Sequence, residues 1–132
     1  MKGFSANIEE MTLQNGNFRK VLYTASHSQL VLMSLQPNED IGKEVHEDND
    51  QFFRFESGQG RVEIDGNAYE VKDGSAIVVP AGAEHNVTNT SGDKELKLYT
   101  IYSPAHHADG VVRATKAEAE ADSPEYDGQN SE

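Results

Sequence analysis

The sequence predicts an all-β protein, an antiparallel sandwich or barrel built as a single domain. Three observations support this fold class. The chain has 132 residues, which suits one domain and is too short for two ordinary ones. Apolar residues make up 36% of it, enough to fill one core. Most of the sequence consists of short apolar runs separated by turn residues, the spacing typical of antiparallel sheets.

Eight segments have the residue composition of strands. The strongest local signal is Asp65-Gly66, because both residues suit the positive φ angles of a two-residue hairpin turn. In the segment before this turn Val62 and Ile64 share one face while charged residues occupy the other, which predicts a half-buried strand. The expected strands are 18–24, 29–36, 51–57, 60–65, 68–71, 75–80, 85–89 and 95–102.

Two of these segments are apolar at every position, namely 30–33 and 77–79. Because successive side chains of a strand point to opposite faces, both faces of the sheet should be covered there. A second sheet, the N-terminal segment or a partner subunit could provide this cover. We favour a homodimer formed through apolar outer strands, with intramolecular cover as the alternative.

The composition changes beyond Gly110. Residues 114–122 are rich in helix formers and predict a short helix, whereas the sequence after Ser123 has no apolar face to bury. We therefore expect a barrel with N-terminal strands over residues 1–113. The short helix and a mobile acidic tail then occupy residues 114–132.

Charge and composition exclude several classes of function. Lys and Arg number 11 against 23 Asp and Glu, and the net charge of −12 argues against nucleic acid or an anionic membrane as a partner. There is no Cys, so any bound metal must be held by His and oxygen ligands. No apolar run reaches the length of a signal peptide or a membrane span, and we expect a cytoplasmic protein.

Several polar residues are spaced so that they could meet at one end of a barrel. Glu44 and His46 are two residues apart and lie on one face of an extended segment. Gln51 begins a strand, and His85 opens another strand after a bend at Pro80 and Gly82. Convergence of these side chains would create a polar site in an otherwise apolar barrel.

Residues 74–89, GSAIVVPAGAEHNVTN, match the second cupin motif, G(x)5PxG(x)2H(x)3N, at every specified position. Residues 38–58 keep the spacing of the first motif, G(x)5HxH(x)3,4E(x)6G, but change three residue types. Asn38 replaces the leading Gly, Glu44 the first His and Gln51 the Glu, while His46 and Gly58 are kept. The chain therefore resembles a small single-domain cupin.

This resemblance implies an antiparallel jelly-roll β-barrel with one divalent metal ion at its open end. Carried over by position, the metal ligands are Glu44, His46, Gln51 and His85. Mn, Fe, Ni and Zn all suit such nitrogen and oxygen donors. One carboxylate among the ligands leaves a local positive charge, which favours a small anionic or polyhydroxylated ligand that chelates through two oxygens.

Three functions fit this site. The first is an enzyme that uses the metal as a Lewis acid on a small sugar, sugar acid or keto acid, in an isomerase or lyase step. The second is a metal-dependent dioxygenase, and the third a non-catalytic module that binds or senses a small ligand. Two alternative site interpretations stay open: a decayed site, and one in which Asp48 or Asp50 joins His46.

The remaining histidines and aromatic residues are expected to be structural. We expect His27 in a surface turn, and His106 and His107 as an exposed pair after the last strand, although the pair could also fold over the barrel's open end. Four aromatic residues should lie in the core, with one or two lining the pocket. They are Phe53, Phe55, Tyr99 and Tyr102.

Overall fold

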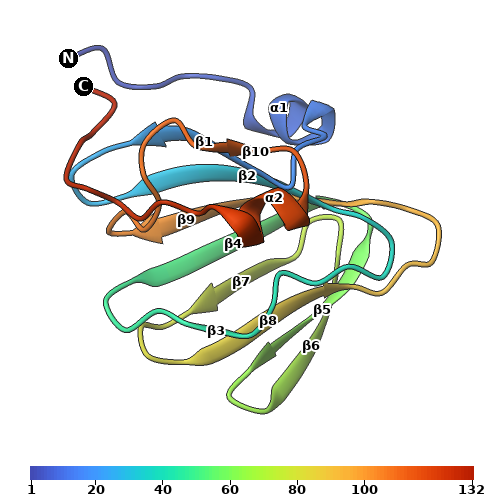
Figure 1. Ribbon diagram of the computed structural model, residues 1–132. Helices are drawn as coiled ribbons and strands as arrows, with labels where there is room; N and C mark the ends of the chain where they lie inside the picture. The colour runs from blue at the N-terminus through green and yellow to red at the C-terminus, as the bar shows by residue number, and fades with distance from the viewer.

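The computed structural model describes residues 1–132 and consists of two antiparallel sheets with two short helices (Figure 1). The six-stranded sheet has the order β10 (Val112–Arg113), β1 (Arg19–Thr24), β2 (Gln29–Leu35), β9 (Leu96–Ser103), β4 (Asp50–Ser57) and β7 (Ala76–Val79). The four-stranded sheet has the order β3 (Glu44–Val45), β8 (Glu84–Asn89), β5 (Gln59–Ile64) and β6 (Asn67–Lys72). The all-β jelly-roll prediction is confirmed.

The core lies between the two sheets. Val31 of β2 and Phe53 of β4 face it from the six-stranded sheet, and Val62 of β5 and Val87 of β8 face it from the other. All four are essentially inaccessible to solvent, as expected where alternate residues of each strand point inward. The Asp65-Gly66 hairpin is also confirmed, because both residues have positive φ angles and join β5 to β6.

A helix that the sequence did not predict covers the outer face of the larger sheet. Helix α1 (Ile8–Gln14) begins at Asn7, whose side chain accepts a hydrogen bond from the Glu10 amide, and it contacts β9 and β4 (Figure 1). Leu32, on the outward side of β2, is only 1% exposed. Part of the cover expected for the apolar strands is therefore intramolecular. Val78 of β7, in contrast, is 64% exposed.

The expected C-terminal helix is present as α2 (Lys116–Ala121), capped by Thr115. The segment after α2, expected to be a mobile acidic tail, makes hydrogen bonds to the rest of the chain. Backbone hydrogen bonds join Ala108 to Pro124, Tyr126 to His106 and Ser131 to Thr24, so the segment runs along the barrel. It is held by hydrogen bonds of its backbone and of side chains such as Ser131 rather than by an apolar face, and for that reason hydrophobic patterning did not reveal it.

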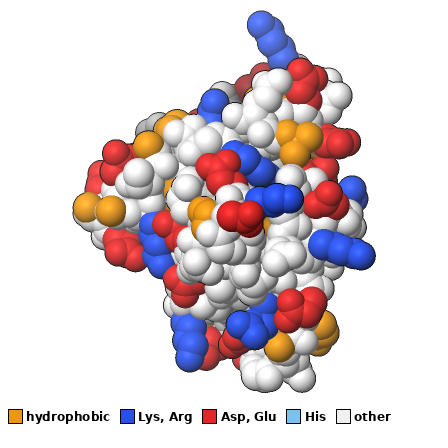
Figure 2. Space-filling view, turned by 90° about the vertical axis from the view of Figure 1, so that its right-hand side faces the viewer, with side chains coloured by type: hydrophobic (Ala, Val, Ile, Leu, Met, Phe, Trp, Pro, Cys, Tyr) orange, Lys and Arg blue, Asp and Glu red, His pale blue; other side chains and the backbone are white.

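The molecular surface carries mixed charges. Figure 2 shows acidic and basic side chains interspersed over one face, with hydrophobic side chains only in small separate groups. Neither helix is long and apolar enough to cross a membrane.

Candidate metal centre

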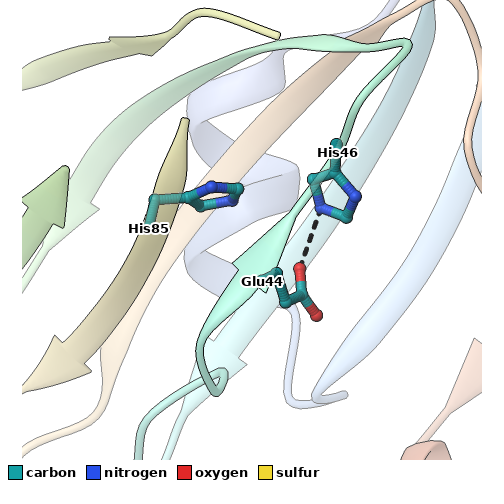
Figure 3. A group of neighbouring side chains, drawn as sticks. All are labelled: Glu44, His46 and His85. Atoms are coloured by element: carbon teal, nitrogen blue, oxygen red, sulfur yellow. Dashed lines mark hydrogen bonds and ion pairs between the residues drawn. The ribbon is translucent and has the colours of Figure 1, made fainter. Parts of the chain in front are cut away.

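Three polar side chains meet at one end of the barrel, where β3 pairs with β8. Glu44 lies directly opposite His85 in this pair, and His46 follows β3 (Figure 3). One potential ligand atom from each residue lies within 4.8 Å of the others. The structure therefore brings together three of the four residues expected to hold a metal: two imidazoles and one carboxylate.

Glu44 and His46 lie on the same side of the chain, as their spacing predicts. The His46 Nε2 atom is 2.9 Å from the Glu44 Oε2 atom, and the dashed line in Figure 3 marks this contact. The His46 carbonyl accepts a hydrogen bond from the Gly82 amide, 2.9 Å away. Gly82 has a φ of +88°, which L side chains rarely adopt, so the bend that holds His46 favours glycine.

The bend at Pro80 and Gly82 also orients His85. The Ala83 amide donates to the Pro80 carbonyl, and the Ala83 carbonyl lies 3.1 Å from Nδ1 of His85. A carbonyl oxygen can only accept, so Nδ1 of His85 donates this hydrogen bond, and Nε2 is the ring nitrogen left for another partner. This is the usual arrangement of a metal-binding histidine, in which one ring nitrogen donates to the protein and the other is free to bind a cation.

Gln51, the fourth expected ligand, is 2% exposed and lies on β4 opposite Tyr102 of β9. Its Nε2 donates to Thr100 Oγ1 over 3.0 Å, but its Oε1 is buried and accepts no hydrogen bond. A buried acceptor without a partner costs about 1 to 3 kcal/mol. A divalent cation would satisfy this oxygen, and the residues present therefore fit a metal ion.

The loop carboxylates considered as alternatives are placed differently. Asp50 is exposed, and its Oδ1 accepts a hydrogen bond from the Ala81 amide at 2.9 Å. Asp48 is exposed and lines a cavity of about 320 Å³ that borders the cluster at His46 and also includes Glu125. Neither belongs to the group formed by Glu44, His46 and His85.

His106 and His107 do not form an exposed pair, so that sequence prediction is wrong. The His106 ring centre is 4.3 Å from that of His46, and the buried His107 has its Nε2 3.2 Å from the Tyr102 hydroxyl. The buried Gln29 explains this position, because its Oε1 accepts hydrogen bonds from both histidine amides. A glutamine among the apolar residues of β2 is the one sequence signal that could have indicated this arrangement.

The surroundings set the charge state of the cluster. Burial acts to raise the pKa of Glu44, but the hydrogen bond to His46 and the charge of Arg19 outweigh it, and the pKa lies below its ordinary value. Burial, followed by the Arg19 charge, lowers the pKa of His107 to about 2. The pKa of His106 is lowered mainly by burial and secondly by the neighbouring His46. The pKa of Tyr102 is raised mainly by burial and secondly by the charge of Glu44. Near neutral pH Glu44 is therefore ionised, whereas His107 is uncharged.

The other sequence expectations for aromatic and histidine residues are met in part. Phe53, Phe55 and Tyr102 are buried, Tyr99 is partly buried, and His27 is exposed. The Tyr102 ring also contacts His46, with ring centres 5.7 Å apart. One core aromatic residue therefore borders the site.

Comparison with known proteins identifies the family. The model of the cupin domain matches residues 31–102. An uncharacterized protein of Bacillus subtilis (strain 168), YrkC, is 50% identical over 127 residues, covering 91% of this chain and 67% of its own. An uncharacterized protein of Acanthamoeba polyphaga mimivirus is 46% identical over 113 residues, which cover 83% of this chain and 70% of the viral protein.

A solved structure agrees with this assignment. The crystal structure of BH2720 from Bacillus halodurans is 46% identical and superposes with a TM-score of 0.89, covering 92% of this chain and 96% of its own. The chain matches the family model over residues 31–102. It also has the second motif in full, the spacing of the first motif, the two-sheet fold and the cluster of Glu44, His46 and His85. The chain belongs to the cupin family.

Proposed function

We propose that this cupin protein holds one divalent metal ion through Glu44, His46, Gln51 and His85 and is an enzyme acting on a small sugar, sugar acid or keto acid. One observation carries the proposal. The buried Gln51 Oε1 has no hydrogen-bond partner, and Gln51 occupies the remaining ligand position of the first motif, which also supplies Glu44 and His46. An unsatisfied acceptor in a ready-made donor set is better explained by a cation than by a structural role.

The donor set limits the choice of metal. Nitrogen and oxygen ligands without a thiolate suit Mn, Fe, Ni and Zn. Two ligands that each lie about 2.1 Å from one ion are at most about 4.2 Å apart, so a small side-chain movement brings the cluster into range. A bound ion would act as a Lewis acid, polarising a carbonyl or hydroxyl oxygen of the substrate for an isomerase or lyase step.

The surrounding residues have separate roles in this proposal. Glu44 supplies the single negative charge among the ligands, and His85 is held in the correct tautomer by the Ala83 carbonyl. The ring of His106 accepts and donates no hydrogen bond within the chain, and it lines the cavity of about 320 Å³ beside His46. A neutral imidazole there can take a proton from a substrate carbon or hydroxyl and return it.

The test is turnover of sugars, sugar acids and keto acids by metal-loaded protein, with and without dioxygen. His85→Ala removes one ligand, and His27→Ala is the matched control at an exposed turn. We expect turnover without dioxygen that is lost after chelation and in His85→Ala but kept in His27→Ala. A strict requirement for dioxygen would favour the dioxygenase alternative. Full metal uptake without turnover would favour a non-catalytic binding module.

A further inference from the structure

A buried arginine lies near the candidate metal centre. Arg19, in β1, is 5% exposed, and it lies opposite Met33 of β2, whose side chain belongs to the core. Residues directly opposite in an antiparallel pair share a face, so Arg19 projects between the sheets. A strand position that faces the core is normally apolar, and a cation there requires an explanation.

The chain provides no direct counterion for this cation, although the Arg19 charge acts on Glu44 and lowers its pKa. Arg19 forms no ion pair with any carboxylate, and its Nε atom is buried without a hydrogen-bond partner. Its one side-chain hydrogen bond runs from Nη1 to Ser123 Oγ and is 3.5 Å long. The other nearby group is the Phe18 ring, whose centre is 5.3 Å from Arg19 Cζ. Because burying an unpaired charge is costly, the guanidinium is poised to receive an anion.

Space for an anion exists beside it. A cavity of about 180 Å³ is lined by two cations, Arg19 and Lys116, by two carboxylates, Glu44 and Glu120, and by the apolar side chains of Phe18 and Ile41. At about 30 Å³ per water molecule this is room for about six waters, or for one small organic acid. Lys116 already pairs with Asp40 and Glu120, so Arg19 is the lining cation without an ion pair. Glu44 belongs both to this cavity and to the metal cluster.

We propose that Arg19 is the carboxylate-binding residue of this site and that the ligand is a small carboxylic acid. The two oxygens of the acid group match the fork of a guanidinium, which binds carboxylates in a bidentate manner. The rest of the molecule extends along the cavity towards Glu44. This inference rests on the proposed function and narrows its substrate class to sugar acids and keto acids, excluding neutral sugars.

The test is calorimetric titration of Mn-loaded and of EDTA-treated protein with pyruvate and glycerate. Pyruvamide and glycerol are the neutral counterparts, and inorganic phosphate is a second anion. Arg19→Met removes the charge and Arg19→Lys keeps it without the fork. Arg61→Met is the control, because the Arg61 side chain is 45% exposed on β5. We expect the acids to bind, and affinity to fall about 10- to 100-fold in Arg19→Met and measurably in Arg19→Lys. Binding should not change in Arg61→Met.

Stability and metal uptake measured on the same samples separate the possible outcomes. Arg19→Met should melt no lower than the wild type, since it removes a buried charge that has no ion pair. Acid binding that depends on Arg19 in protein without metal uptake would support this inference and contradict the proposed function. Normal metal uptake with equal acid affinity in wild type and Arg19→Met would contradict the inference alone. Failure of the metal-loaded wild type to bind either acid, or tighter binding of phosphate, would also overturn it.

Discussion

Replacing Gln51 by Leu should change stability in opposite directions with and without metal. Leu has a similar size but no polar atoms, so the substitution removes the buried Oε1 that accepts no hydrogen bond. Removing this unsatisfied buried acceptor should raise the free energy of unfolding by about 1 to 3 kcal/mol, while loss of the hydrogen bond to Thr100 should lower it by about 1 kcal/mol. Without metal, Gln51→Leu should therefore be between equal to the wild type and about 2 kcal/mol more stable.

Metal reverses this order. A ligand present at a thousandfold its dissociation constant stabilises the folded state by about 4 kcal/mol, and at tenfold by about 1.4 kcal/mol. If loss of the Gln51 oxygen weakens binding about 100-fold, the metal-dependent rise in Tm should shrink to roughly a third. For a chain of 132 residues each kcal/mol corresponds to about 3 to 5 °C, so the difference is readily measured.

The assay is thermal unfolding of wild type and Gln51→Leu after chelation and at several MnCl₂ concentrations. Unfolding in urea without metal checks the free energy directly. The proposed role of Gln51 is wrong if Gln51→Leu lowers stability in chelated protein while the metal-dependent rise in Tm stays unchanged. That result would make Gln51 a structural hydrogen-bonding residue.

Three further predictions concern the barrel. Asn89→Ala should lower the free energy of unfolding by about 3 kcal/mol or more, because the Asn89 side-chain amide donates to three backbone carbonyls. Urea titration measures this difference, and a loss under about 1 kcal/mol would contradict the prediction. A hydrogen bond from Lys116, followed by one from Asn86, lowers the pKa of Asp40 in the folded protein. The ionised Asp40 therefore stabilises the fold above the ordinary pKa of 3.8, and this stabilisation is lost as the pH falls through the lower pKa of the folded state. Asp40→Asn should thus cost up to about 1 kcal/mol at pH 7 and nothing at the lowest pH, whereas a pH-independent difference would disprove the ionic role. Val78→Asp should convert the proposed homodimer to monomer in light scattering, because Val78 is the most exposed residue of an apolar strand; a monomeric wild type would reject the dimer.

Most of the barrel follows from local sequence rules. Strand β5 alternates buried and exposed residues and leads into a turn that needs positive φ angles, so its pairing with β6 and the register are encoded locally. The missed α1 depends on a short capping signal at Asn7, and its position depends on a sheet face formed by distant residues. β3 and β10 have two residues each, too few for periodicity to reveal.

The candidate site shows the same division. The motif positions predicted that Glu44, His46 and His85 would meet, because their spacing and the bend at Gly82 determine where the side chains point. His106 could not be placed in this way, since its position depends on Gln29, 77 residues earlier in the chain. For a related reason, nothing in the sequence indicated the role of Arg19. Its burial results from the packing of α2 and β2 rather than from its neighbours in sequence.

Elemental analysis of protein purified without added metal or chelator, compared with His46→Ala and His85→Ala, is the decisive test of the metal centre. We expect close to one divalent ion per chain in the wild type and little or none in either variant. The control variant His27→Ala should retain the metal, and all proteins should keep the β-sheet signal in circular dichroism. Metal content that is unchanged in His85→Ala, or a wild type that takes up no metal even after soaking, would contradict the assignment of these residues to a metal centre.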